Sequence, residues 1–221
     1  AQGYGCTLNG KHPSDWADIA TTSFFPAKPL GCYGDGGAIV TNDAALAERI
    51  ESLRVYGKVT PTDAATRNFH HDPKYLSLRV GMNSRLDTIQ AAILLEKLKI
   101  FADEIERRQV VADRYAKGLR GAIRGVPEVI EGGRSVWAQY VIEHDQRDGL
   151  QAHLTAQGIP SMVYYPVPIH QQDFALRFAP AAGHLKVTEA ASQHVLALPM
   201  HPYLEPSDQN RVIDAVLGFN G

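Results

Sequence analysis

A single lysine stands in an apolar, aromatic stretch of this 221-residue chain. Lys28 follows the aromatic pair Phe24 and Phe25 and is itself followed by a glycine-rich turn. Apolar neighbours lower the pKa of a lysine by desolvation and leave its amine as a nucleophile. This pattern is typical of a lysine that forms a Schiff base with a carbonyl substrate or with pyridoxal phosphate (PLP). The same residues also suit a lysine whose stem lies along a loop between two strands and whose ammonium reaches water.

The elements around the lysine are predicted to be two short buried strands. Residues 19–23 and 37–41 form these strands, and the lysine loop connects them. Asn42 or Asp43 then caps an amphipathic helix. Residues 57–82 have no clear period and hold several prolines and glycines, so we expect a long loop. A long loop inside a compact domain is usually functional or mobile.

The longest helix is predicted to begin at Ser84 and to run to Leu119. Ser84 together with Asp87 is a variant of the capping box. An apolar stripe continues through the segment at helical spacing. At about 1.5 Å per residue such a helix is roughly 50 Å long. That is longer than one small domain, so we expect the helix to bridge two domains.

After Gly121 the pattern predicts alternating strands and helices. The strands are expected at 136–143 and 161–165 and in the apolar stretch 195–200, and the helices at 145–157, 188–194 and 206–217. This order indicates a small α/β or α+β domain.

The lysine segment and four later stretches resemble one known family. The segment reads Ser-Phe-Phe-Pro-Ala-Lys-Pro-Leu-Gly-Cys-Tyr-Gly-Asp-Gly-Gly-Ala, and the later stretches are Arg54–Gly57, Gly81–Ala92, Tyr165–His170 and Leu198–Tyr203. In this order, and over nearly the whole chain, they resemble the DegT-type nucleotide-sugar aminotransferases. These are PLP-dependent enzymes with the fold of aspartate aminotransferase. Five motifs in family order are far more specific than a lone lysine motif.

The resemblance implies an α/β fold, the PLP-dependent transferase fold type I. Residues 1–83 would be the C-terminal part of the large PLP-binding domain, 84–120 the bridging helix and 121–221 the small C-terminal domain. The family's Asp that bonds the pyridine nitrogen would lie just before residue 1. We therefore expect a C-terminal portion of a longer protein, which is not active as a free polypeptide.

Four residues are implied to hold PLP. Lys28 would be the covalent anchor and the carrier of the transferred proton. Ser23 would bind the phosphate, and Gln2 the ring hydroxyl O3′. Asn83 would reach the phosphate of the neighbouring subunit, so the resemblance implies a homodimer with shared active sites. The structural alternatives are a strand-end serine, an amide at a frayed terminus and an ordinary turn asparagine.

Two residues in a proline-punctuated loop are implied to face the sugar substrate. Tyr165 and His170 offer hydrogen bonds from rigid rings, although a loop histidine is often simply exposed. His201 is a weaker candidate. The pair His70-His71 does not indicate a metal site, because no third ligand has suitable spacing and adjacent side chains diverge.

The implied activity is transfer of an amino group from glutamate to a keto nucleotide sugar. The sequences of the motifs are most similar to those of one branch of the family. That branch acts on UDP-linked 3-keto N-acetylhexosamines or hexuronic acids in bacterial surface-polysaccharide synthesis. A 4-keto nucleotide-sugar substrate is an alternative. A PLP sugar dehydratase of the same fold would carry histidine in place of Lys28. A non-catalytic PLP-fold regulator or assembly subunit is the alternative of another class.

Composition restricts the remaining function classes. The net charge is −2, so there is no electrostatic case for nucleic acid or a membrane surface. No run approaches the roughly 20 apolar residues of a membrane span. The only cysteines are Cys6 and Cys32, which is no disulfide framework and favours cytosolic thiols. Composition thus indicates a cytoplasmic protein, and the resemblance implies that its partners are a nucleotide sugar, glutamate and a second copy of itself.

Overall fold

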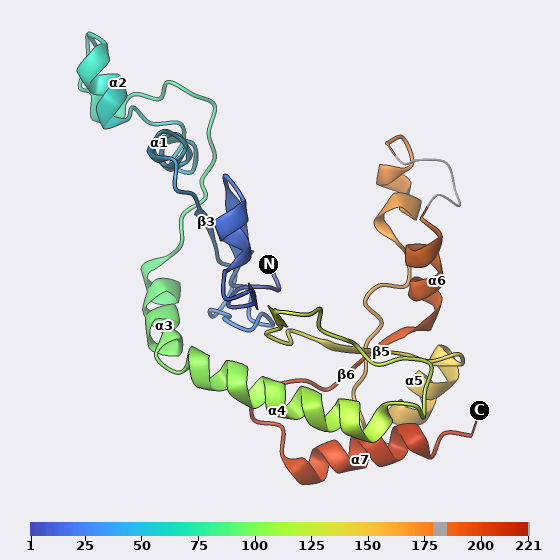
Figure 1. The fold of residues 1–221 in the computed structure, drawn as a ribbon. Helices are drawn as coiled ribbons and strands as arrows, with labels where there is room; N and C mark the ends of the chain where they lie inside the picture. The colour runs from blue at the N-terminus through green and yellow to red at the C-terminus, as the bar shows by residue number, and fades with distance from the viewer. Residues whose placement is uncertain (179–184, 221) are drawn as a thin grey trace. The chain divides into compact units, whose positions relative to one another are not determined.

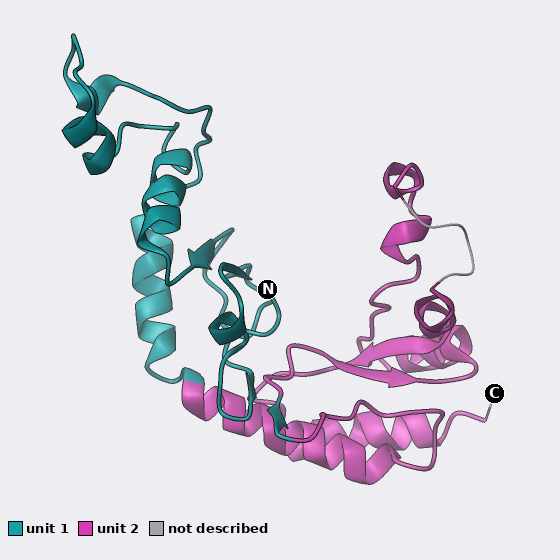
Figure 2. Ribbon diagram, turned by 45° about the horizontal axis from the view of Figure 1, so that its top comes forward, with its two compact units in different colours: residues 1–101, 132–134 teal, residues 102–131, 135–221 magenta. Residues whose placement is uncertain are grey.

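The computed structural model describes residues 1–178 and 185–220, and the chain divides into two compact units (Figures 1 and 2). Unit 1 contains residues 1–101 and 132–134, and unit 2 contains residues 102–131 and 135–221.

Unit 1 is built on the hairpin that carries the lysine loop. Strand β2 (Ala20–Ser23) pairs antiparallel with β3 (Gly37–Val40), with Ala20 opposite Val40 and Ser23 opposite Gly37. Both predicted strands are present, but they are not buried as predicted, since Ile39 and Val40 of β3 are 49% and 47% exposed. A further small pair joins β1 (Thr7–Leu8) to β4 (Gly133–Arg134), and the 3-10 helix η1 (Pro13–Trp16) follows β1. The sequence analysis missed this pair, because two-residue strands carry no periodic signal.

Helix α1 (Ala44–Leu53) follows the hairpin as predicted. The Asp43 carboxylate is its N-cap and accepts hydrogen bonds from the backbone N–H groups of Ala45 and Leu46, at 2.8 and 3.1 Å. These are two of the N–H groups that a helix leaves unsatisfied at its start.

The segment 57–82 contains more structure than the long loop that we expected. It holds α2 (Pro61–Thr66) and the 3-10 helix η2 (Pro73–Tyr75). Thr60 and Asp63 form a reciprocal capping box at the start of α2, and Pro61 stands in its first turn. The prediction of a loop without helices is wrong here. The four residues Thr60–Asp63 are the only sequence signal for the start of α2, and so short a signal was not recognised.

A partly buried ion pair, in which Asp63 is buried and Arg79 is 26% exposed, stabilises this segment. Both terminal nitrogens of the Arg79 guanidinium donate to the Asp63 carboxylate, at 2.7 and 3.0 Å. The same guanidinium donates to the hydroxyl of Ser52 on α1 at 3.2 Å. Arg79, followed by the backbone N–H of Thr60, holds the pKa of the Asp63 carboxyl well below its usual range. The pair therefore fixes the segment to the rest of unit 1.

The single helix predicted from Ser84 to Leu119 is wrong in its start and in its continuity. The structure has α3 (Thr88–Leu98) and α4 (Phe101–Leu119). The Ser84 N–H bonds to the Arg54 carbonyl instead of opening a helix. At the break, the N–H groups of Lys99 and Ile100 bond to carbonyls three residues back, the tighter pattern of a 3-10 turn. The boundary between the two units falls just after this break.

Unit 2 packs helices against a two-stranded sheet. Strand β5 (Tyr140–Glu143) pairs antiparallel with β6 (Val195–Leu198), and α4, α5 (Arg147–Ala156) and α7 (Pro206–Leu217) bury their apolar faces with it. The described core includes Tyr115, Leu119, Tyr140, Ile142, Leu150, Leu154, Leu196 and Val212. The prediction for α7 is confirmed at both ends.

The other predictions for unit 2 hold less well. Helix α5 is shorter than predicted, and α6 (Lys186–His194) begins two residues before Thr188. The predicted strand at 161–165 is wrong, because only Met162 pairs, through an isolated bridge to Ala197. Prolines at both sides of that stretch remove the donors that a longer ladder needs. The 3-10 helices η3 (Ile169–Gln171) and η4 (Asp173–Ala175) follow it.

We predict that this partly buried ion pair makes stability depend on pH. Asp63 has a lower pKa in the folded state than its unfolded value of about 3.9, so the pair stabilises fully above that value and loses its effect as the pH falls. Arg79→Met should lower the melting temperature of the intact protein at about pH 7. The difference from the natural protein should shrink as the pH falls from about 4 to about 2.

The matched control is Lys99→Met, which removes an exposed pair with Glu96. Exposed pairs contribute little, so this variant should melt like the natural protein. Equal melting temperatures of Arg79→Met and the natural protein at about pH 7 would contradict the role of the pair.

Candidate functional site

The loop that carries Lys28 is closed by backbone hydrogen bonds. The Phe24 N–H donates to the Gly36 carbonyl at 2.7 Å, and the Cys32 N–H donates to the Phe24 carbonyl at 2.7 Å. The Lys28 N–H donates to the Phe25 carbonyl at 2.9 Å. The fold thus continues the β2–β3 pairing into the loop and fixes the backbone on both sides of the lysine.

Close backbone packing inside the loop requires glycine at position 31. A Cβ atom there would lie 2.5 Å from the Pro26 carbonyl oxygen and 2.9 Å from that of Phe25. Both neighbours are backbone atoms, which cannot rotate away as a side chain can. The turn after Lys28 therefore depends on Gly31.

Helix α3 holds the same loop through two side chains. The Lys97 ammonium donates to the Gly31 carbonyl at 2.6 Å, and the Gln90 amide donates to the Tyr33 carbonyl at 3.0 Å. The sequence analysis missed both contacts. No local signal could have found them, because they join residues more than 50 positions apart.

The Lys28 side chain itself is half-buried. Within residues 1–178 and 185–220, its ammonium has no hydrogen-bond or ion-pair partner. Its backbone is fixed by the loop, and its ammonium is not engaged by another described side chain. Partial burial of the residue fits both a reactive lysine and a lysine whose stem lies along the loop while its ammonium reaches water.

Ser23 and Gln2 lie in the same part of unit 1. Ser23 ends β2, and its hydroxyl oxygen accepts the Phe25 N–H at 3.2 Å, which leaves the hydroxyl hydrogen free to be donated. Gln2 is exposed. Two residues later the Tyr4 ring packs against the ring of Phe24, with centroids 6.2 Å apart. Ser23 and the N-terminal segment thus both contact the first residues of the lysine loop, and a hydroxyl donor, an amide and an amine are the groups that a phosphorylated aldehyde needs.

Asn83 lies elsewhere in unit 1. It bridges to Val55, and its side-chain oxygen accepts from Arg85 at 3.0 Å. Asn83 lines a hollow of about 1230 Å³ beside β3 and α1, and neither Ser23 nor Lys28 lines that hollow. Asp35 and Gly36, at the end of the lysine loop, line the same hollow, so Asn83 lies near the end of the loop, in a hollow that Lys28 does not line.

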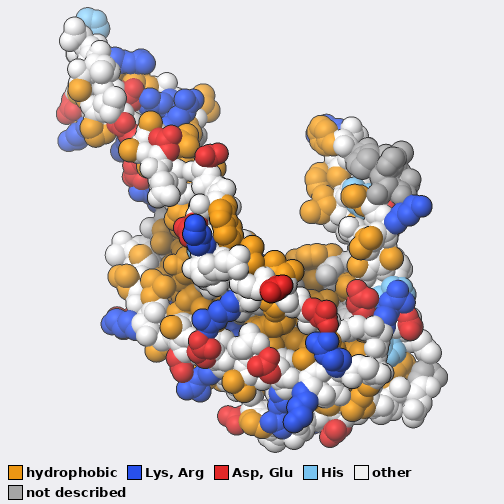
Figure 3. Space-filling view, in the orientation of Figure 1, with side chains coloured by type: hydrophobic (Ala, Val, Ile, Leu, Met, Phe, Trp, Pro, Cys, Tyr) orange, Lys and Arg blue, Asp and Glu red, His pale blue; other side chains and the backbone are white. Residues whose placement is uncertain are grey.

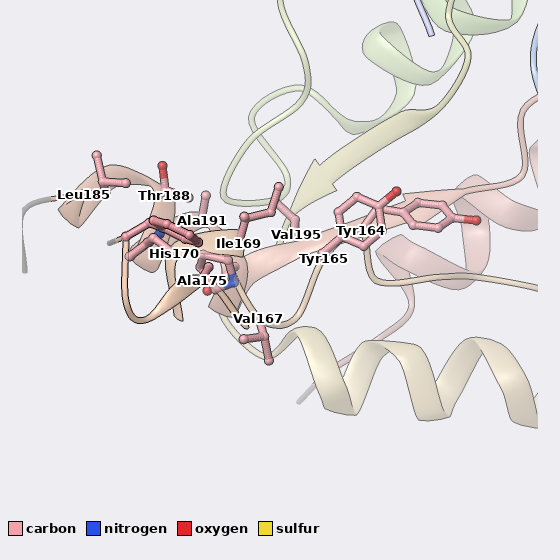
Figure 4. A pocket seen from close by; sticks show the side chains of 13 residues that line it. Tyr164, Tyr165, Val167, Ile169, His170, Ala175, Leu185, Thr188, Ala191 and Val195 are labelled. Atoms are coloured by element: carbon pink, nitrogen blue, oxygen red, sulfur yellow. The ribbon is translucent and has the colours of Figure 1, made fainter. Parts of the chain in front are cut away.

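Tyr165 and His170 line one cavity of unit 2, of about 640 Å³ (Figure 4). Figure 4 shows the tyrosine rings at one end of this cavity and Leu185 and Thr188 of the α6 region at the other. The His170 ring is 11% exposed, and its Nε2 lies 3.0 Å from an oxygen of Glu189. The sequence analysis missed Glu189. His201 is exposed and does not line the cavity.

The described residues hold neither a cluster of metal ligands nor a helix that could span a membrane. No cluster of three or more histidine, cysteine, aspartate or glutamate side chains there could hold a metal ion. No helix in this part of the chain has the length and apolarity to cross a membrane.

Known proteins resemble the chain closely in sequence and in structure. Residues 1–217 match the model of the DegT/DnrJ/EryC1/StrS aminotransferase family. The UDP-2-acetamido-2-deoxy-3-oxo-D-glucuronate aminotransferase of Pseudomonas aeruginosa is 45% identical over 93% of this chain and 53% of that protein. A pleiotropic regulatory protein of Geobacillus stearothermophilus is 39% identical over 99% of this chain and 56% of that protein.

A solved structure confirms the predicted fold class. The crystal structure of a DegT DnrJ EryC1 StrS aminotransferase from Brucella abortus matches with a TM-score of 0.89 and 46% identity, over 100% of this chain and 56% of that one. The chain spans about half the length of the curated relatives that it matches. It is thus similar to the C-terminal portion of these proteins, as expected.

We predict that Lys97 keeps the lysine loop in place. Lys97→Met removes a charged donor to the Gly31 carbonyl, a contact that typically contributes about 1.5–3 kcal/mol. The backbone N–H groups of residues 24–36 should then exchange with deuterium at least about tenfold faster in the intact protein. Hydrogen–deuterium exchange with mass spectrometry measures this rate.

Lys99→Met is again a suitable control, because Lys99 is an exposed neighbour just past α3. It should leave exchange in the loop unchanged. If Lys97→Met and Lys99→Met gave the same exchange as the natural protein, Lys97 would have no positioning role.

Proposed function

The chain belongs to the DegT/DnrJ/EryC1/StrS aminotransferase family, and on this basis we propose that the whole protein is a PLP-dependent aminotransferase. The observation that carries the proposal is Lys28. It is a half-buried amine without a partner in the described part of the chain, on a loop held by backbone bonds and by α3. A reactive lysine needs this combination of partial desolvation and fixed position.

Lys28 has two tasks in this proposal. It holds the cofactor covalently, and after substrate has displaced it, its free amine carries a proton to and from the substrate carbon. It is the only amine on residues 24–36, so no neighbour on the loop can replace it. When bound, PLP supplies the electron sink that makes this carbon acidic.

Ser23, Gln2 and Asn83 complete the cofactor site that we propose. Ser23 donates its hydroxyl hydrogen to the phosphate, and Gln2 donates its amide to the ring oxygen. Asn83 acts on the phosphate in the partner subunit, and neither Lys28 nor Ser23 of its own chain lines the hollow that Asn83 lines. The active enzyme is then a homodimer, with residues 84–120 connecting a large and a small domain.

The proposed substrates are glutamate and a UDP-linked sugar with a keto group at position 3. The Pseudomonas aeruginosa relative is named for such a sugar, an acetamido-3-oxo-glucuronate. Tyr165 and His170 would contact the sugar from their shared cavity. The pathway would be bacterial surface-polysaccharide synthesis in the cytoplasm. A 4-keto nucleotide sugar is the alternative substrate.

A second candidate function is that of a non-catalytic regulator. It is favoured by the name of the Geobacillus stearothermophilus relative, a pleiotropic regulatory protein. Such a protein would not need a reactive amine at position 28. The enzyme proposal explains why hydrogen bonds from the backbone and from α3 hold the lysine loop in place, and the regulator proposal does not.

We predict that Lys28→Ala abolishes amino transfer in the intact protein. Loss of the general acid–base group alone costs about 100- to 10,000-fold in rate. Turnover with glutamate and a UDP-linked 3-keto sugar would be measured, with Lys11→Ala, an exposed lysine of the same unit, as the control. Normal turnover by the Lys28 variant would reject the proposed function.

We also predict that Asn83→Ala weakens PLP retention without dissociating the dimer. One donor to a phosphate contributes about 1.5–3 kcal/mol, so the dissociation constant of PLP should rise at least about tenfold. Cofactor titration and analytical ultracentrifugation measure the two quantities. The control is Asn42→Ala, another exposed loop asparagine. Unchanged PLP affinity in the Asn83 variant would remove Asn83 from the cofactor site.

A further inference from the structure

The cavity in unit 2 has a mostly apolar wall in which the His170 ring is set. Val167, Ile169, Ala191 and Val195 supply part of the apolar lining, and His170 stands among them. Hydrophobic side chains also gather at the surface of this part of unit 2, where Phe174 is 64% exposed (Figure 3). Sites for small organic molecules have this character, a largely apolar wall with a few placed polar groups.

Glu189 determines how the His170 ring can be used. The two residues come from different elements, η3 and α6, and lie 19 positions apart. An ionised carboxylate only accepts hydrogen bonds, so the ring nitrogen that faces it, Nε2, must carry the proton. In the neutral ring, the other nitrogen Nδ1 is then an acceptor. Among the described residues, Nδ1 has no hydrogen-bond partner.

We propose that Glu189 is a positioning residue that fixes the His170 ring so that Nδ1 accepts a hydrogen bond from the sugar substrate. The ligand group must be a donor, either a ring hydroxyl or the N–H of an acetamido substituent. The apolar lining suits the carbon face of the sugar or the acetyl methyl group. The inference rests on the proposed function for the identity of the ligand. The orientation of the His170 ring and the acceptor role of Nδ1 follow from the His170–Glu189 geometry.

The size of the cavity agrees with this ligand. Its volume of about 640 Å³ lies within the roughly 300–1,000 Å³ of ordinary small-molecule sites. Exposed Tyr165 stands in the same lining and offers a second hydrogen-bonding group. A hexose with one substituent is small enough for this space.

A purely structural role for Glu189 is the competing explanation. Glu189 lies in the first turn of α6, where an acidic side chain stabilises the helix N-terminus. Glutamine separates the two roles. It loses the charge that acts on the helix, but its amide oxygen still accepts the Nε2 proton. Leucine loses both the charge and the acceptor.

The test is equilibrium binding by the intact protein. UDP-N-acetylglucosamine is the probe, because it has a hydroxyl where the proposed substrate has its keto group and so cannot react. Glu189→Leu should raise its dissociation constant about tenfold, the loss typical of one well-placed hydrogen bond, and Glu189→Gln less than about threefold. Asp208→Leu, which removes a first-turn acid from α7, is the control and should bind like the natural protein.

UDP-2-deoxyglucose distinguishes the two donors, since it has neither an acetamido group nor a hydroxyl at carbon 2 and keeps the other ring hydroxyls. If the acetamido N–H is the donor, Glu189→Leu weakens only the binding of UDP-N-acetylglucosamine. If a shared hydroxyl is the donor, the binding of both probes weakens. Either pattern supports the positioning role.

Three results would overturn the inference. These are binding by Glu189→Leu within twofold of the natural protein, equal losses in the leucine and glutamine variants, and no binding of either probe by the natural protein. If the leucine variant does not fold, nitrogen-15 NMR of the His170 ring decides. A proton on Nε2 supports the proposal, and a proton on Nδ1 overturns it.

The proposed function is tested separately by the reaction with glutamate alone. A natural protein that binds the probe but takes no amino group from glutamate would contradict the proposed function and leave the role of Glu189 intact. If the natural protein takes an amino group from glutamate but Glu189→Leu binds the probe normally, the proposed function stands and the role of Glu189 is contradicted.

Discussion

The geometry of unit 1 depends on the closure of the lysine loop. The pairing of Ser23 with Gly37 sets the two ends of the loop, and backbone bonds continue inward from there. Gly31 passes so close to the Pro26 carbonyl that no side chain fits, and Lys97 holds the Gly31 carbonyl from outside. Lys28 is consequently held by its backbone, and only its side chain is free to move. A nucleophile has to be positioned in this way before its chemistry can be efficient.

Our proposals depend on one partly buried ionisable side chain in each unit. In unit 1 this is the Lys28 amine, and in unit 2 it is His170, which Glu189 orients. Asn83 faces a separate hollow of unit 1, and our dimer proposal gives it a ligand in the partner subunit. In our proposals, unit 1 holds the cofactor and unit 2 contacts the sugar.

Local sequence signals predicted the helices whose ends are set by neighbouring residues. The Asp43 cap and the α7 helix that begins at Pro206 were both found, because caps and prolines act on their own neighbours. The break after Leu98 was missed, since no glycine or proline marks it and the apolar stripe continues across it. The partners Lys97 and Glu189 were missed for another reason. Each acts on a residue far away in the sequence, and spacing along a chain does not report such contacts.

The central claim is that Lys28 binds the cofactor covalently, and peptide mass spectrometry after borohydride reduction tests it most directly. The intact protein would be purified with PLP, reduced and digested. Our account predicts a phosphopyridoxyl group on the peptide that contains Lys28 and on no other lysine peptide. A fully loaded protein with the group on another lysine, or with none after reduction, would contradict the account.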